Sequence, residues 1–372
     1  MVAITKIEVF RADLPLKEGR YSWARGKFVD VFDCTLVRIS TDVGVHGIGE
    51  VTPLGPFYLP AYGPGAREGI RHMAPHLLGM DPTQLEVVNA TMDEVLMGHS
   101  YCKSPIDMAC WDIFGKLCKL PVCVLLGGRF TQTIPLYRAI SQESPESMAD
   151  KVAGYREEGY RKFQLKVGGD ATLDAARIHA VASKLDIAGG DTLVADANRG
   201  WLAEEATRVV RAVQDLDIYI EQPCNTYEEC LKVRQRTRHP FVLDESIDSI
   251  EAFLRAHADQ AMDAFNLKIS KVGGLTRARQ IRDLGARLGY AMTIEDSWGG
   301  DVVTAAISHL AASTPTRCLY ASTDFNSYVT LSTATGAPQR RNGTMEASDQ
   351  AGLGVELRED VIGQAVDVYG NA

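Results

Sequence analysis

The first third of the chain alternates apolar with polar positions and then changes to the spacing of amphipathic helices. Alternation with a period of two over 4–10 and 34–39 predicts β-strands. Further along, apolar residues recur every three or four positions, which predicts helices over 72–78, 87–97 and 105–117. A sheet followed by helices is an α+β arrangement. We therefore expect an α+β domain over residues 1–125.

A segment rich in proline, glycine and aromatic residues, 52–65, lies between the predicted strands and the predicted helices. Segments of this composition are commonly plain surface loops. The concentration of Phe57, Tyr58 and Tyr62 favours instead a lid that closes over a site. Both interpretations stay open on the sequence alone.

From about residue 133, short runs of β-branched and apolar residues alternate with amphipathic stretches. In one such stretch Ala206, Val209, Val210 and Val213 share a helix face. Eight runs have the length of buried strands: 134–139, 162–167, 192–196, 218–221, 241–244, 264–269, 291–295 and 319–322. Eight strands that alternate with helices about every 25 residues are typical of a TIM-type α/β barrel. We assign 126–340 to this barrel and expect 341–372 to return to the first domain.

Charged side chains recur at the C-terminal ends of successive predicted strands: Lys166, Asp196, Glu221, Asp244, Lys268 and Asp296. Neighbouring members lie about one strand–helix unit apart, so a barrel would place them on one rim. The active sites of TIM barrels are built on that rim.

Three carboxylates on adjacent strands, from Asp196, Glu221 and Asp244, would repel one another unless a positive charge lies between them. Oxygen ligands without histidine favour a hard divalent cation, Mg²⁺ above all. Lys166 and Lys268 would then flank whatever the metal binds and form an acid–base pair. One acidic residue at a strand end is usually a helix cap, and one lysine is usually a solvated charge. Five such residues in register favour a metal-dependent site.

Charge and cysteine content narrow the class of partner. The chain has 372 residues and a net charge of −9, which argues against nucleic acid and anionic membranes. It shows neither a charged leader before an apolar run nor the roughly 20 apolar residues of a membrane span. Its eight cysteines include no CxxC pair, which predicts reduced thiols rather than disulfides or a zinc site. We expect a cytoplasmic protein that binds a small molecule.

Five strings in the barrel region resemble the enolase superfamily, in its muconate-lactonising-enzyme branch. They are QLKVG at 164–168, VADAN at 194–198, IEQP at 220–223, LDES at 243–246 and NLKISKVGG at 266–274. The resemblance implies a modified (β/α)7β barrel, with a capping domain built from the N-terminal segment and the C-terminal return. It further implies Mg²⁺ ligands at Asp196, Glu221 and Asp244, acid–base lysines at Lys166 and Lys268, and a symmetric homo-oligomer.

The second predicted barrel strand departs from the family pattern K-x-K, because Gln164 stands where the first lysine is usual. A neighbouring ammonium would lower the pKa of Lys166 by like-charge repulsion, and a neutral amide cannot. The metal and burial must then tune Lys166, or the role of base falls mainly to Lys268. We expect Lys271 to point elsewhere and to be structural.

Further strings resemble the members of the superfamily that act on proline derivatives. They are PLGPFY at 53–58, GHSYCKS at 98–104, EQPCN at 221–225 and DSWGGD at 296–301. The shared step of the superfamily is removal of the proton α to a carboxylate, with Mg²⁺ stabilising the enediolate. A β-hydroxyl could then leave as water, whereas without a leaving group the opposite lysine would reprotonate the carbon and epimerise it.

The nitrogen of the substrate separates these outcomes. A quaternary ammonium is best held by an aromatic face, whereas a secondary ammonium needs a carboxylate. Asp324, after the last predicted strand, favours a secondary amine, and Asp296 could reinforce it; Asp324 as a plain turn residue is the alternative. The remaining candidates for substrate contact are Phe57, Tyr58 and Trp298, which would pack on the ring, together with Gln164 and Asn198.

The leading hypothesis is therefore Mg²⁺-dependent dehydration of cis-3-hydroxy-L-proline to Δ1-pyrroline-2-carboxylate. A single lysine could take the α-proton and then assist loss of the hydroxyl, because cis geometry permits both on one face. The first alternative is 2-epimerisation of proline betaine or 4-hydroxyproline betaine. An acid-sugar dehydratase is a weaker alternative, since no histidine stands at a late strand end. A non-catalytic binding scaffold is the last.

Overall fold

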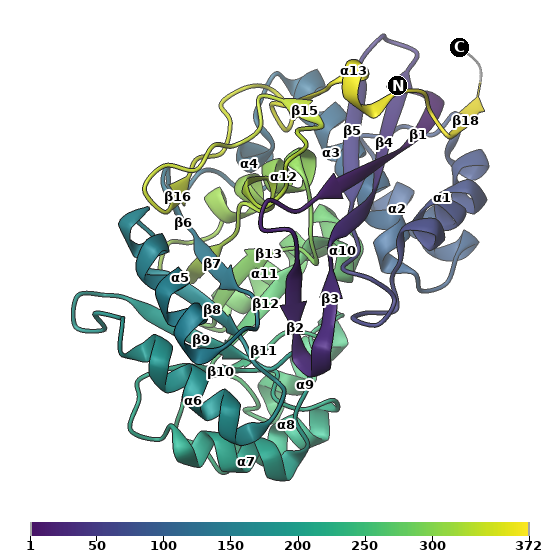
Figure 1. Cartoon of the computed structure of the whole chain (residues 1–372). Coiled ribbons are helices and arrows are strands. Elements are labelled where there is room, and N and C mark those ends of the chain that lie inside the picture. The colour runs from purple at the N-terminus through teal and green to yellow at the C-terminus, as the bar shows by residue number, and fades with distance from the viewer. Residues whose placement is uncertain (1, 371–372) are drawn as a thin grey trace.

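The computed structural model describes residues 2–370 (Figure 1). Its N-terminal part is a four-stranded antiparallel sheet in the order β18-β1-β4-β5. The strands are β1 (Ile4–Pro15), β4 (Val31–Thr41), β5 (His46–Val51) and β18 (Asp367–Gly370). Three helices cover the sheet: α1 (Gly63–Leu77), α2 (Leu85–Val95) and α3 (Ser100–Cys118). The α+β pattern is confirmed, although the helices begin before the first apolar position of each predicted range.

The second part is an eight-stranded parallel sheet in the order β14-β13-β12-β11-β10-β9-β8-β7. An isolated bridge between Leu136 and Ser322 joins its two edges. The strands are β7 (Tyr137–Ile140), β8 (Lys162–Lys166), β9 (Thr192–Asp196), β10 (Tyr219–Glu221), β11 (Phe241–Leu243), β12 (Ala264–Lys268), β13 (Ala291–Glu295) and β14 (Leu319–Ser322). The predicted barrel is therefore confirmed.

Helices connect the barrel strands and cover their outer side (Figure 1). They are α5 (Pro145–Glu157), α6 (Ala171–Ala182), α7 (Ala203–Ala212), α8 (Tyr227–Arg234), α9 (Ile250–Ala258), α10 (Ile269–Val272), α11 (Leu275–Arg287) and α12 (Asp301–Ala312). In α7 the apolar positions Ala206, Val209 and Val210 are buried, as their helical spacing predicts. Since β14 ends the alternation, the barrel has the (β/α)7β form.

The first predicted barrel strand is in fact two elements. Residues Ile134–Pro135 form β6, which pairs with β16 (Thr344–Met345) outside the barrel, and only Tyr137 begins β7. Pro135 cannot donate a ladder hydrogen bond, so the run of apolar residues cannot continue as one central strand.

Two segments of the N-terminal part reach the mouth of the barrel. The hairpin of β2 (Tyr21–Trp23) and β3 (Lys27–Val29) extends from the sheet across the barrel strands (Figure 1). Two hydrogen bonds of Ser22 hold it there: the Ser22 N–H donates to the Ser141 hydroxyl at 2.8 Å, and the Gln142 N–H donates to the Ser22 carbonyl at 2.9 Å. Between the two strands of the hairpin, η1 (Ala24–Gly26) forms its tip. The second segment that reaches the mouth of the barrel is 52–62.

After the barrel the chain contacts both parts of the molecule. It forms η2 (Phe325–Ser327), β15 (Ala334–Thr335), β17 (Glu356–Leu357) and α13 (Glu359–Ile362), and β15 pairs with β17. Its last strand, β18, pairs with β1 of the N-terminal sheet. The short α4 (Val122–Leu125) connects α3 to the barrel. Among residues 2–370, no helix is long and apolar enough to cross a membrane.

The N-terminal sheet is attached to the barrel through a buried carboxylate. Glu50 of β5 accepts hydrogen bonds from the backbone N–H groups of Gly300 (2.5 Å), Val302 (3.0 Å) and Val303 (3.0 Å). These groups are the unpaired donors at the start of α12, where a negative charge is favourable. Glu50 therefore caps a barrel helix from the other part of the molecule.

A buried histidine makes the stability of this region sensitive to acid. His309 of α12 accepts from the backbone N–H of Cys123 at 3.2 Å and contacts the carbonyl of Leu353 at 3.1 Å through Nε2. Burial lowers the pKa of His309 to about 4. Its pKa in an unfolded chain is about 6.5, so between these values the unfolded chain takes up a proton that the folded chain does not.

We therefore expect His309 to lower the free energy of unfolding as the pH falls from 6.5 towards 4, by about 3 kcal/mol at most. Above pH 6.5 we expect no such effect. The measurement is the thermal midpoint of the native chain and of His309→Gln at several pH values from 8 to 4. From pH 6.5 to pH 4, the thermal midpoint of the native chain should fall more than that of the variant. A difference between the two that does not change with pH would contradict the prediction.

Candidate active site

The ends of β8 and β9 bring a lysine and an aspartate together at the barrel mouth. Lys166 and Asp196 are register partners in adjacent strands, and Lys166 Nζ donates to Asp196 Oδ2. Both side chains are buried. Burial disfavours the charge of Lys166, but its acidic neighbours, Asp196 first and then Tyr21 and Glu221, together outweigh burial and raise the pKa of the lysine. Lys166 is thus held as an ammonium for as long as Asp196 is its partner.

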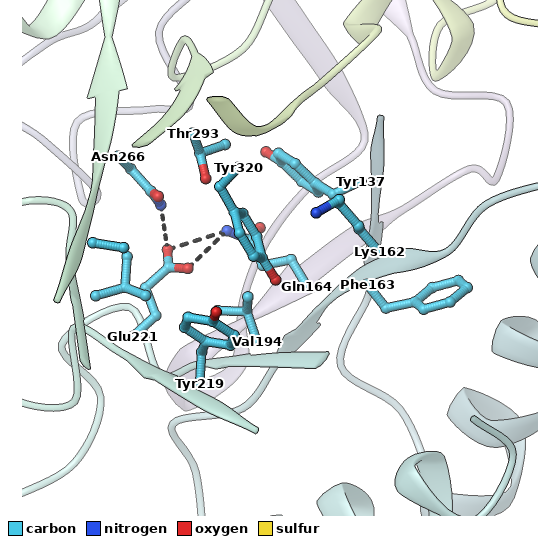
Figure 2. Close-up of a pocket in the computed structure, with 12 residues that line it drawn as sticks. Tyr137, Lys162, Phe163, Gln164, Val194, Tyr219, Glu221, Asn266, Thr293 and Tyr320 are labelled. Atoms are coloured by element: carbon cyan, nitrogen blue, oxygen red, sulfur yellow. Dashed lines mark hydrogen bonds between the residues drawn. The ribbon is translucent and has the colours of Figure 1, made fainter. Parts of the chain in front are cut away.

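Glu221 ends β10 and is held by amides rather than by a cation. Gln164 Nε2 donates to its two oxygens at 3.1 and 3.2 Å, and Asn266 Nδ2 donates at 2.8 Å (Figure 2). Burial and the neighbouring carboxylates of Asp196 and Asp244 raise the pKa of Glu221. Gln164, which replaces the first lysine of the family pattern, therefore donates hydrogen bonds to the Glu221 carboxylate.

Asp244, directly after β11, is bound by two lysines. Lys268 Nζ lies 2.6 Å from its Oδ2, and Lys271 Nζ lies 2.9 Å from its Oδ1. Burial raises the pKa of Asp244, but the two lysines outweigh burial and lower it. The expectation that Lys271 points elsewhere is wrong, because α10 begins directly after Lys268 and one helical turn returns Lys271 to the same carboxylate.

Lys166 and Lys268 border one cavity, which they reach from β8 and β12. Five of the other predicted residues line it as well: Tyr58, Gln164, Asn198, Asp296 and Trp298. The space inside is about 20 Å³ for a water-sized sphere, which is room for little more than one water molecule. A proline-sized ligand can therefore enter only if part of the wall moves.

The segment 52–62 supplies part of this wall, as expected of a lid. The Tyr58 hydroxyl donates to Asp244 Oδ2 at 2.9 Å and accepts from Lys268 Nζ at 2.5 Å. The Arg199 guanidinium donates to the Tyr58 carbonyl. Tyr58 is buried, and its hydroxyl lies between Lys268, a predicted acid–base lysine, and Asp244, a predicted metal ligand.

Two of the predicted contact residues lie outside the lining of the cavity. Phe57 is 48% exposed and stacks on Trp23, with ring centroids 5.8 Å apart, so it joins the lid to the hairpin. Asp324 is buried next to Tyr160, whose hydroxyl lies 3.4 Å from its Oδ1. Because β14 has already ended at Ser322, the chain turns before Asp324 and directs that carboxylate away from the cavity.

Asp296 lines the cavity, but its oxygens are already used. They accept from the backbone N–H of Ser270 at 3.0 Å, from the Ser270 hydroxyl, and from the Ser297 N–H at 2.6 Å. Burial raises the pKa of Asp296 to about 6. Asn198 likewise serves its neighbours: its N–H donates to Asp196 at 2.8 Å and its amide to Glu245 at 3.3 Å.

Sequence reasoning missed several residues that line the cavity, among them Tyr21, Tyr137 and Glu295. Glu295 is the register partner of Lys268, so the strand pairing points both side chains inward. Because Glu295 comes just before Asp296, at the end of a predicted barrel strand, the sequence could have indicated it. Tyr21 lies on the hairpin, and no local sequence pattern indicates that residues 21–29 reach the barrel.

The donor set fits a divalent cation. Asp196, Glu221 and Asp244 supply only oxygen, which hard cations prefer, and all three are buried. Together with the buried Glu245 and Glu295, the carboxylates outnumber the ammonium groups of Lys166, Lys268 and Lys271. Within residues 2–370, however, no three acidic, histidine or cysteine side chains converge on one point, because lysines and amides hold the carboxylates. These residues could hold Mg²⁺ only after the lysines release Asp196 and Asp244.

Comparison with known families matches both parts of the chain. Residues 13–127 match the mandelate racemase/muconate lactonizing enzyme N-terminal domain, and residues 147–361 match the enolase C-terminal domain-like family. The chain therefore belongs to the enolase superfamily, in the mandelate racemase/muconate lactonizing enzyme group.

Among curated proteins, the chain is 57% identical to cis-3-hydroxy-L-proline dehydratase from Roseibium aggregatum, over 98% of this chain and 99% of that protein. It is 27% identical to N-succinyl-L-Arg/Lys racemase from Bacillus cereus, over 96% of each. Among solved structures, a mandelate racemase/muconate lactonizing enzyme from Roseovarius nubinhibens matches with a TM-score of 0.97 and 40% identity, over all of both chains. A superfamily member from the same organism, complexed with magnesium, matches with a TM-score of 0.94 and 41% identity, also over both whole chains.

Proposed function

We propose that the protein is a Mg²⁺-dependent dehydratase that converts cis-3-hydroxy-L-proline to Δ1-pyrroline-2-carboxylate. The observation that carries the proposal is the pair of lysines, Lys166 and Lys268, which border one small cavity beside three buried carboxylates. The 57% identity with a dehydratase of that substrate, over nearly the whole chain, supports the choice of reaction. Kinship with the superfamily supports a cytoplasmic homo-oligomer as the working form.

Removal of the α-proton is the difficult step, because a carbon next to a carboxylate is a very weak acid. A divalent cation held by Asp196, Glu221 and Asp244 would supply Lewis-acid stabilisation to the charge that develops on the substrate carboxylate. Lys166 or Lys268 takes the proton as a free amine. Either lysine becomes easier to deprotonate once its carboxylate partner is withdrawn, since burial alone disfavours its charge.

The electrons of the broken C–H bond then form a double bond to the β-carbon, and the β C–O bond breaks. A lysine ammonium gives its proton to the departing hydroxyl, so that water leaves. The remaining enamine tautomerises to the imine product. The cavity wall contributes by excluding bulk water, because Trp298, Phe325 and Leu54 line it and are buried.

The test is incubation in D₂O with Mg²⁺, in one sample with cis-3-hydroxy-L-proline and in another with proline betaine. Loss of water with a new imine absorbance supports the dehydratase. Deuterium at the α-carbon of proline betaine, with mixed stereochemistry and no dehydration of the hydroxyproline, would show the 2-epimerase instead. The ring of Trp298 disfavours that alternative, because it is already stacked on Phe32, with ring centroids 4.3 Å apart, and contacts the tilted Phe325 ring at 4.9 Å.

Metal binding gives a prediction independent of turnover. Mg²⁺ at about 100 times its dissociation constant should stabilise the folded chain by about 2.7 kcal/mol and raise its thermal midpoint. Asp244→Asn should reduce that rise, since a neutral amide is a poorer ligand for a hard cation. The measurement is thermal melting with and without Mg²⁺. An equal rise in both proteins would contradict the assignment of Asp244.

A further inference from the structure

The proposed mechanism gives no task to the buried carboxylate of Glu295. Glu295 is 1% exposed and lines the cavity. Its Oε2 accepts from the Tyr137 hydroxyl, whereas its Oε1 has no hydrogen-bond partner in the described chain. The nearest cation, Lys268 Nζ, lies 3.6 Å from Oε1, beyond hydrogen-bond distance, and is itself 2.6 Å from Asp244.

An unpaired carboxylate oxygen in such a place is costly to bury. Removing a charged acceptor from water without a compensating hydrogen bond destabilises the fold by kilocalories per mole. Such groups persist where a ligand completes them. The strand pairing that aims Lys268 into the cavity aims Glu295 there too, since the two are register partners. The missing donor must therefore come from the cavity side.

We propose that Glu295 accepts a hydrogen bond from the ring ammonium of the substrate, with Tyr137 as the positioning residue that fixes its carboxylate. This proposal rests on the proposed function, and it names the group that selects prolines with a free N–H. A secondary ammonium carries two N–H donors and a positive charge, which satisfies Oε1 on both counts. A betaine nitrogen has no N–H and would leave Oε1 unpaired.

The other acidic residues near the site are less suitable as acceptors. The oxygens of Asp296 already accept from Ser270 and Ser297. Asp324 Oδ2 is likewise unpaired, but Asp324 lies beside Tyr160 and does not line the cavity. Asp244 is bound by Lys268 and Lys271. Glu295 alone among these four combines a place on the wall with an unpaired oxygen.

The experiment compares two ring carboxylates that differ only at the position of the nitrogen. L-proline carries a secondary ammonium, and (S)-tetrahydrofuran-2-carboxylate carries an ether oxygen. Their dissociation constants are measured by titration calorimetry with Mg²⁺, for the native chain and for Glu295→Gln, Tyr137→Phe and Asp324→Asn. In the native chain we expect L-proline to bind at least about tenfold more tightly.

In Glu295→Gln that preference should fall about ten- to hundredfold through weaker binding of L-proline, while the ether binds within about twofold of its native affinity. Tyr137→Phe keeps the Glu295 carboxylate but should lose part of the preference for L-proline over the ether. This variant therefore tests the proposal if Glu295→Gln fails to fold. Asp324→Asn, the matched acidic control, should keep the preference.

Three results would overturn the proposal. If Glu295 only balances the charge of Lys268, both ligands will weaken together in Glu295→Gln. If Asp324→Asn abolishes the preference, the acceptor is Asp324. If the native chain does not discriminate between the two ligands, no acceptor exists. Failure of the proposed function is a separate observation, namely that the native chain does not dehydrate cis-3-hydroxy-L-proline.

Discussion

Lys268→Ala is expected to lower kcat for dehydration of cis-3-hydroxy-L-proline by about 10²–10⁴-fold, the usual worth of a positioned proton-transfer group. Lys268 borders the cavity from β12, opposite Lys166 on β8, and burial keeps it away from bulk water. Nothing else described on that side of the cavity can exchange a proton as an amine, since Lys271 is turned to Asp244 and to backbone carbonyls.

The control is another lysine of the same barrel. Lys162 lies at the opposite end of β8 from Lys166, with its Nζ 4.1 Å from the centre of the Tyr320 ring. Lys162→Met should fold and keep kcat within a few-fold. Circular dichroism and the thermal midpoint confirm that Lys268→Ala is folded. Full activity in a folded Lys268→Ala protein would remove Lys268 from the mechanism.

Lys268→Ala also shows which lysine removes the α-proton. L-proline lacks the β-hydroxyl, so its α-hydrogen can only exchange in D₂O. If Lys166 removes that proton, Lys268→Ala retains exchange but loses dehydration; if Lys268 removes it, exchange is lost as well. Proton magnetic resonance of the recovered L-proline gives the answer directly.

Glu221→Ala is expected to lower kcat/KM by about 10³-fold or more, because loss of a metal ligand weakens charge stabilisation worth several kcal/mol. Among the three predicted ligands, Glu221 is the one bound by amides rather than by a lysine. Its removal therefore frees no ammonium group, and the loss reports on the metal more cleanly than a change at Asp196 or Asp244.

The measurement is steady-state kinetics over a range of Mg²⁺ concentrations. The native chain should lose activity in a chelator and recover it with Mg²⁺, whereas Glu221→Ala should need far more Mg²⁺ or fail to recover. Glu228→Ala, an exposed carboxylate on α8 that pairs with Arg255, is the matched control. Activity of Glu221→Ala that is independent of added Mg²⁺ would contradict the assignment.

The barrel could be predicted from the sequence because its signals are local. Runs such as 162–167 and 291–295 have the length and β-branched content of buried strands, and they recur at the spacing of one strand–helix unit. That spacing alone sets Lys166, Asp196, Glu221, Asp244 and Lys268 on one rim. Only the first strand was misjudged, at Pro135, where the missing N–H divides the run.

The details of the site depend on contacts between distant segments, which no local pattern encodes. Phe57 and Tyr58 are neighbours in one loop, yet Tyr58 enters the cavity and Phe57 stacks on the hairpin. Asp324 and Glu295 are both acidic residues near strand ends, and the turn after β14 decides that only Glu295 faces inward. Choosing between such pairs requires the backbone path, which the sequence does not supply residue by residue.

Because the Glu50 carboxylate joins the N-terminal sheet to α12, the barrel depends on the N-terminal part of the chain. It supplies the partner for three N–H groups at the start of α12, shortly after Ser297 and Trp298, which line the cavity. An isolated barrel would expose those donors and lose the support of that wall. If the N-terminal part of a relative is grafted onto this barrel, the graft must therefore bring an acidic residue to the same place on its strand to keep the start of α12 satisfied.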